Sequence, residues 1–159
     1  MHIKILCVGR LKEDFFVKAV AEYVKRLSKY CRLEIIEVDD EPASGSESTR
    51  TEEIIKSAEG ARLTKHIDAD SYVIALAIEG KKLDSVKFSK KIEELGLTGK
   101  SDVTFIIGGS LGLDKEILKR ADMLLSFSDM TFPHQLMRVI LLEQIYRAFR
   151  IMRNEPYHK

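Results

Sequence analysis

The chain has 159 residues, of which 45% are apolar and 32% charged, and its formal net charge is +1. This length fits one domain with a substantial core, and the sequence lacks both a secretory signal pattern and an apolar run near the roughly 20 residues that a membrane span needs. Cys7 and Cys31 are not clustered with other ligand residues, so we expect reduced thiols in a cytoplasmic protein without a structural zinc site.

Hydrophobic patterning predicts strands that alternate with helices along the whole chain. The segment 72–78 is almost uniformly apolar, which is typical of a strand buried on both faces of a parallel sheet. The alternation therefore predicts an α/β fold with a mostly parallel sheet and helices on both faces. In chain order we expect a strand at 3–8, a helix at 12–30, a strand at 33–38, a loop at 39–49, a helix at about 51–67, a strand at 72–78, a helix at about 85–95, a strand at 103–107, a short helix at 114–120, a strand at 123–127 and a helix at about 133–152.

The last predicted helix is apolar around most of its circumference. A helix that packs only on a sheet needs an apolar face about 100° wide, and the apolar residues of 133–152 cover more than that. This helix therefore needs a second partner, and we expect the partner to be the same helix of another subunit in an isologous homodimer.

Two loops rich in glycine, serine and threonine follow short strands in the last third of the chain. One is Gly108–Gly112 after the strand at 103–107, and the other is Ser126–Gln135 after the strand at 123–127. Open α/β sheets bind ligands at the carboxyl ends of their strands, so both loops are expected to line one pocket. The chain has no Walker-type phosphate loop, and Gly9-Arg10-Leu11-Lys12 after the first strand lacks the Gly-x-Gly-x-x-Gly pattern.

Each loop also has a structural interpretation. One glycine would suffice for a tight turn after the strand at 103–107, and one of Ser126, Ser128 and Thr131 would suffice to cap the last helix. The loops contain more glycines and hydroxyl groups than a turn and a cap require. This surplus favours a ligand site.

Charged residues are unevenly distributed in spite of the small net charge. Basic residues outnumber acidic ones in 1–33 and in 131–159, whereas acidic residues dominate 34–70. The distribution fits two interpretations. Either solvated faces segregate by charge, or both ends of the chain form a basic surface for a polyanion.

A family resemblance extends over the whole chain and depends most on its C-terminal segments. The matching segments are Gly108–Gly112, Ser126–Arg138, Glu143–Ala148 and Tyr157–Lys159, together with Val8–Lys12 and Glu79–Lys81. In these segments the chain resembles the ribosomal RNA large subunit methyltransferase H family, which belongs to the SPOUT class of knotted methyltransferases. The resemblance implies a single SPOUT-like domain over 1–159, a trefoil knot within about 72–159, and an obligate homodimer.

The resemblance also implies a cofactor and the loops that bind it. Members of the family bind S-adenosylmethionine in three loops that follow strands. By position these loops correspond to Leu76 in the strand at 72–78, to Gly108, and to the segment after the strand at 123–127. The residues of this last segment are Phe127, Ser128, Asp129, Met130, Thr131 and Phe132.

The family's reaction places a methyl group on N3 of a pseudouridine in large-subunit (23S) ribosomal RNA. Displacement at a sulfonium needs alignment of the reactants and removal of the N3 proton, and it needs no metal. The resemblance assigns the tail to this task, with His158 as base or proton shuttle, Tyr157 stacked on the target base and Lys159 on phosphate. His134, in the first turn of the last helix, is the other candidate base.

The substrate must be presented with N3 accessible. Because N3 lies on the pairing edge, the target base must be unpaired or flipped out. We expect Arg138, Arg147 and Arg153 to bind RNA, and we expect the dimer to recognise the assembled ribosome with basic surface from both subunits. Glu143 and Arg147 are also spaced as a structural ion pair. The alternative is a non-catalytic dimeric α/β module that binds a nucleotide or a protein partner.

Overall fold

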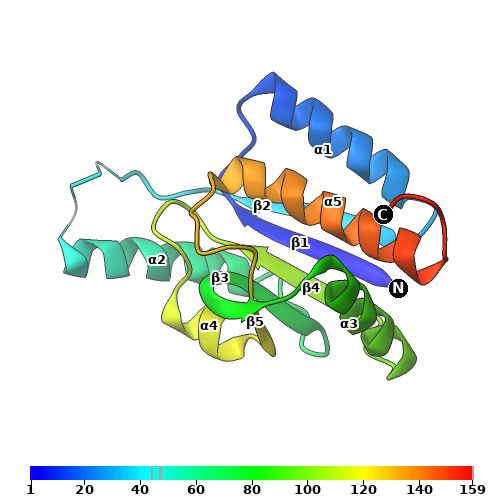
Figure 1. The fold of residues 1–159 in the computed structure, drawn as a ribbon. Coiled ribbons are helices and arrows are strands. Elements are labelled where there is room, and N and C mark those ends of the chain that lie inside the picture. Colours follow the sequence, from blue (N-terminus) through cyan, green and yellow to red (C-terminus); the bar gives the residue numbers. More distant parts are fainter. Residues whose placement is uncertain (44, 47, 159) are drawn as a thin grey trace.

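The computed structural model describes residues 1–43, 45–46 and 48–158. Within these residues the strands form one all-parallel sheet in the order β2-β1-β4-β3-β5 (Figure 1). The strands are β1 (His2–Val8), β2 (Arg32–Val38), β3 (Tyr72–Lys82), β4 (Asp102–Ile107) and β5 (Met123–Ser126).

Helices cover both faces of the sheet, as the alternation of elements predicts (Figure 1). They are α1 (Asp14–Leu27), α2 (Thr49–Thr64), α3 (Ser85–Leu97), α4 (Lys115–Arg120) and α5 (His134–Met152). The core on one face joins strand residues to α3 and α5, and the core on the other face joins them to α2 and α4. The predicted α/β class with helices on both faces is confirmed.

Strand β1 is apolar along almost its whole length because both of its faces are buried. Ile3, Ile5 and Cys7 belong to the core beneath α5, whereas Leu6 and Val8 belong to the core beneath α2 and α4. Successive side chains of a strand point to opposite faces, so a central parallel strand needs apolar residues at both parities. Burial raises the pKa of the Cys7 thiol to about 12, which leaves this thiol protonated and unreactive.

Most predicted elements lie within three residues of the observed bounds. Asp84 and Asp114 are helix N-caps, and their carboxylates accept hydrogen bonds from the backbone N–H groups of Lys87 and Glu116. The largest difference concerns β3, which continues to Lys82 instead of ending near residue 78. Within this extension β3 contacts β5 a second time, and this contact organises the C-terminal half of the fold.

The extended strand β3 meets β5 twice. Leu125 of β5 pairs with Leu76 and also with Lys81, and the next pair is Lys82 with Ser126. Gly80 lies between these two contacts, so close that a Cβ atom there would stand 2.7 Å from the backbone atoms of Leu124 and Leu125. The backbone of β3 is therefore pressed directly against the backbone of β5. Close threading of this kind is what a knot requires, and the predicted trefoil knot itself stays a prediction.

Helix α5 has apolar neighbours on several sides within one chain. It packs on the sheet and contacts both α3 and α1 (Figure 1). Part of the apolar surface that we assigned to a second subunit is therefore covered by α1. Helix α1 in turn exposes Phe15, Val17 and Val24. The homodimer stays a prediction, and none of the described helices is long and apolar enough to cross a membrane.

Replacing Gly80 with alanine tests the close approach of the two strands. The added Cβ has no space against the backbone of β5. We expect Gly80→Ala to destabilise the protein by about 3 kcal/mol and to lower its Tm by roughly 6–12 °C, measured by calorimetry.

Gly96→Ala is the matched control. A Cβ at Gly96 in α3 meets only the flexible end of the Met1 side chain, at 3.3 Å. Alanine is a better helix former than glycine, so this variant should be as stable as the wild type or slightly more stable. Equal Tm values for the two variants would contradict the proposed packing at Gly80.

Candidate functional site

The sheet register brings the three predicted cofactor segments to one edge. Ala75 pairs with Ile106, which places Leu76 at the level of the residue before Gly108. On its other side Leu76 pairs with Leu125, directly before the loop that begins at Ser126. The carboxyl ends of β4 and β5 therefore flank the middle of β3. Ligands of open α/β sheets bind at such an edge.

The glycine-rich loop folds tightly on itself. Gly109 and Gly112 form an isolated bridge, with the N–H of Gly112 donating to the carbonyl of Gly109 at 3.1 Å. A Cβ on Gly108 would stand 2.8 Å from the carbonyl group of Gly112, and Gly112 has a φ of +87°. These positions exclude larger residues for reasons of backbone geometry. The tight turn therefore accounts for these glycines, and within the loop Gly112 is exposed to solvent.

Hydrogen bonds within the loop after β5 fix its course. The buried Ser126 hydroxyl donates to the carbonyl of Ser128 at 3.1 Å, and the Ser128 hydroxyl accepts from the N–H of Met130 at 2.9 Å. An ion pair between Lys82 and Asp129 ties the loop to the end of β3.

These serines do not cap the last helix. The N-cap residue of α5 is Pro133, and no side-chain hydrogen bond caps this helix within the described part of the chain. The suggestion that Ser126, Ser128 or Thr131 serves as the cap is therefore wrong. The serine hydroxyls are used inside the loop instead, which the residue types alone do not reveal.

A cleft adjoins the start of this loop. It has a volume of about 320 Å³, near the lower end of the range for small-molecule sites. Apolar side chains, among them Phe88 and Phe127, form part of its wall, and polar side chains of Ser85, Ser126 and Gln144 form another part. Apolar walls with a few polar groups suit a nucleoside, so these residues fit the adenosyl group that the resemblance implies.

The C-terminal tail packs on the outer half of α5. The Tyr157 hydroxyl donates to Glu143 at 3.1 Å, and the Arg147 guanidinium lies 4.8 Å from the centre of the Tyr157 ring. Burial raises the pKa of Tyr157 to about 12, so its hydroxyl stays a proton donor at neutral pH. His158 is exposed, with Nδ1 at 3.4 Å from Arg147. Lys159 lies outside the described residues.

Glu143 has a larger role than its sequence spacing suggests. Its ion pair with Arg147, at 2.6 Å, agrees with the expected i, i+4 pair. The same carboxylate also receives the Tyr157 hydroxyl, so it anchors the tail. No feature of the local sequence points to this second contact, because the two residues are 14 positions apart.

The tail lies far from the cofactor edge of its own chain. Arg147 is in the fourth turn of α5, about 20 Å along the axis from the start of the helix at the cofactor loop. In Figure 1 the C-terminus lies toward the end of the molecule that holds the N-terminus, whereas the strands point toward the opposite end. One chain alone does not bring Tyr157 and His158 to its own cofactor loops.

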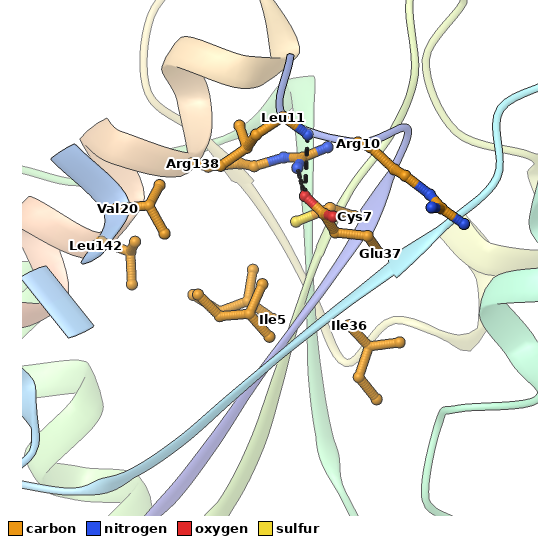
Figure 2. Close-up of a pocket in the computed structure, with 10 residues that line it drawn as sticks. Ile5, Cys7, Arg10, Leu11, Val20, Ile36, Glu37, Arg138 and Leu142 are labelled. Carbon is orange, nitrogen blue, oxygen red and sulfur yellow. Dashed lines mark hydrogen bonds and ion pairs between the residues drawn. The ribbon is translucent and has the colours of Figure 1, made fainter. Parts of the chain in front are cut away.

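Arg138 is buried and does not form part of the surface. Its side chain donates to Glu37 at 2.5 Å and to the carbonyls of Val8 and Gly9 at 2.9 and 2.6 Å. Glu37 also accepts the N–H of Leu11 at 3.1 Å. This network closes one end of a cleft of about 560 Å³ between α1, α5 and the strands β1 and β2 (Figure 2). We therefore remove Arg138 from the expected RNA surface and assign it a structural role.

The remaining candidates are partly or fully accessible. His134 is half-buried, and burial, followed by the charge of Arg138, lowers its pKa. Its Nε2 atom would lie 3.4 Å from a Cβ on Gly9, so the His134 ring faces the C-terminal end of β1. Arg153 is exposed over the ring of Tyr30, at 4.7 Å from the ring centre.

Comparisons with known proteins identify relatives of the same length and a solved structure with a similar fold. The family described as predicted SPOUT methyltransferase matches residues 1–158. Two relatives named Ribosomal RNA large subunit methyltransferase H, from Clostridium kluyveri and Bifidobacterium adolescentis, are 58% and 60% identical over 159 residues, with 100% of each chain covered. A solved structure of a probable methylase family protein from Haemophilus influenzae superposes with a TM-score of 0.56 at 13% identity, covering 99% of this chain and 70% of that one. This last likeness concerns the fold alone.

Removing the charge of Arg138 tests its structural role. Arg138→Gln leaves Glu37 and two backbone carbonyls with fewer partners. We expect a loss of about 2–3 kcal/mol in the free energy of unfolding, measured with urea, and no specific loss of RNA affinity in the folded protein. Arg10→Gln, whose side chain is 72% exposed and pairs with Asp39, is the control and should change stability by less than about 0.5 kcal/mol. Normal stability with weakened RNA binding in Arg138→Gln would restore Arg138 to the RNA surface.

Proposed function

Because the chain belongs to the SPOUT methyltransferase family, we propose that it methylates N3 of a pseudouridine in large-subunit ribosomal RNA. The chain is an S-adenosylmethionine-dependent methyltransferase. The observation that carries the choice of substrate is the full-length match, at 58% and 60% identity, to relatives named for large-subunit ribosomal RNA. The convergence of three strand-end segments at one edge of the sheet supports a common cofactor site.

The proposed donor site consists of the backbone near Leu76, the loop at Gly108 and the segment from Phe127 to Phe132. Leu76 packs on the core, so its side chain is structural and its main chain is the part offered to an adenine ring. When bound, the cofactor supplies an activated methyl group on a sulfonium. The task of the protein is to hold the acceptor in line and to exclude competing geometries.

The proposed acceptor site uses the tail. His158 takes the N3 proton, because its imidazole is exposed on the tail and a neutral ring nitrogen can accept a proton. Tyr157, held by Glu143 and Arg147, presents its ring to the target base, and Lys159 contacts phosphate. Arg147 and Arg153 supply further positive charge beside the tail.

We propose that the tail of one subunit lies beside the donor site of the other in a homodimer, so that each complete active site contains residues of both subunits. The distance along α5 separates the tail from its own cofactor loops, so a single chain does not supply a complete site. The exposed apolar residues Phe15, Val17 and Val24 of α1 offer a surface for this association. The partner in this proposal is a second copy of the same chain.

Methylation of ribosomes tests the proposed substrate. Purified protein and labelled S-adenosylmethionine are added to intact ribosomes and to a free transcript of the modified stem-loop. We expect at least about tenfold faster methylation of ribosomes, because a chain of this size needs contacts spread over a large particle, and mass spectrometry should place the label on N3 of a pseudouridine. Equal rates on the free transcript would contradict ribosome recognition. Cofactor binding without any methyl transfer would favour the non-catalytic module.

Mixed dimers test whether the tail acts in trans. His158→Ala alone should lose at least about 100-fold in turnover and keep its affinity for S-adenosylmethionine, whereas His66→Ala, at an exposed position, should do neither. Gly108→Val should abolish cofactor binding, because its side chain meets the backbone of Gly112.

A mixed dimer of His158→Ala and Gly108→Val subunits contains one complete site if the tail acts in trans, and it should recover about half of the wild-type rate per dimer. An inactive mixed dimer would show that the tail acts within its own chain.

A further inference from the structure

A buried carboxylate on α2 lies directly behind the glycine-rich loop. Glu59 is 5% exposed, and a Cβ on Gly109 would stand 3.1 Å from its Oε2 atom. The other oxygen of the carboxylate, Oε1, accepts the N–H of Glu41 at 3.0 Å. The carboxylate therefore lies directly against the backbone of Gly109, next to the Val8 side chain.

Helix α2 holds this carboxylate at a fixed position. The next residue, Gly60, is so close to Asp114 that a Cβ atom would stand 2.8 Å from the Asp114 side chain. Asp114 is the N-cap of α4 and ends the segment that begins with the glycine-rich loop. Two neighbouring residues of α2 thus contact both ends of residues 109–114. The carboxylate and the loop are therefore packed against each other.

The charge of Glu59 is only partly compensated by its surroundings. Among the described charged groups that act on it, Asp40 and Glu41 are acidic, and the basic Arg62 is itself paired with the Glu41 carboxylate. Burial is the largest cause that raises the pKa of Glu59, and the N–H of Glu41 opposes this effect. A partly compensated buried carboxylate favours a cation nearby.

We propose that Glu59 is a specificity residue that makes the site prefer the cationic methyl donor to its neutral product. This inference rests on the proposed function, since it takes the glycine-rich loop as part of the donor site. S-adenosylmethionine carries one positive charge in excess, on the sulfonium. Transfer of the methyl group converts the sulfonium to an uncharged thioether in S-adenosylhomocysteine. The carboxylate attracts the donor before transfer and has no such attraction for the product.

This attraction has a kinetic consequence. It is present in the bound donor and fades as the sulfonium charge disappears in the transition state. An interaction of this kind lowers the KM for the donor without raising kcat, and it assists exchange of product for fresh donor. A purely structural Glu59 would affect donor and product equally.

Calorimetric titration with each ligand tests the proposal. Glu59→Gln keeps the shape of the side chain and an acceptor for the N–H of Glu41, and it removes the charge. We expect the Kd for S-adenosylmethionine to rise about tenfold, and the Kd for S-adenosylhomocysteine to change by less than about twofold. Glu53→Gln removes one charge from the exposed face of the same helix and should leave the ratio of the two Kd values unchanged.

Further measurements separate the possible outcomes. Glu59→Asp keeps the charge and should retain the preference for the donor. In the wild type, added KCl should weaken donor binding more than product binding, which gives a test independent of any variant's folding. Equal weakening of both ligands by Glu59→Gln, or an equal effect of salt on both, would overturn the proposal. A wild-type protein that binds neither ligand would instead refute the proposed function.

Discussion

The close contact between the backbones of β3 and β5 is the constraint on which the C-terminal half of the structure depends. Leu125 pairs with residues from two parts of β3, and Gly80 lies against the peptide groups between them. This contact fixes where β5 ends, and therefore where the loop after Ser126 begins. It also places Lys82 beside that loop, where it pairs with Asp129. A close-packed backbone crossing holds the donor loops rigidly without a separate domain.

A second set of contacts connects the N-terminal half to the same edge. Arg138 of α5 donates to the carbonyls of Val8 and Gly9 at the end of β1, and Gln135 accepts the N–H of Lys12 at 3.0 Å. Glu59 of α2 faces the loop after β4. Polar contacts thus connect the ends of β1 and β4 to α5 and α2. The Arg138 and Glu59 side chains are buried, so removing a partner from either one costs stability. The edge is therefore held by contacts on both sides of the sheet.

The sequence predicts the element types and the parallel sheet because the spacing of apolar residues reflects which side of each element is buried. In this fold that side is set by the sheet and by the helix layers on its two faces. The helix caps at Asp84 and Asp114 are local features as well, because a short polar side chain just before a helix can accept a hydrogen bond from its first N–H groups. The crossing at Gly80 is not, since Glu79-Gly80-Lys81 has the composition of an ordinary turn.

The sequence predicts the loops of the site better than it predicts the roles of single side chains. The glycine- and serine-rich loops identify the edge, and family resemblance adds Leu76, whose local sequence is that of a core strand. An arginine on a helix that binds phosphate has the same sequence appearance as Arg138, which is 2% exposed and bound to backbone carbonyls. Glu59 likewise belongs to a helix with many charged residues, and only the tertiary packing shows that it is buried. Long-range contacts of single side chains are the part that local patterns do not encode.

A crystal structure of the protein with S-adenosylmethionine would show whether the donor binds where these strand ends meet. We predict density for the ligand at the carboxyl edge of β4, β3 and β5, in contact with the backbone near Leu76, the loop at Gly108 and the segment from Phe127 to Phe132. Density in the cleft beside Arg138 shown in Figure 2, or at any other place away from these strand ends, would contradict the account.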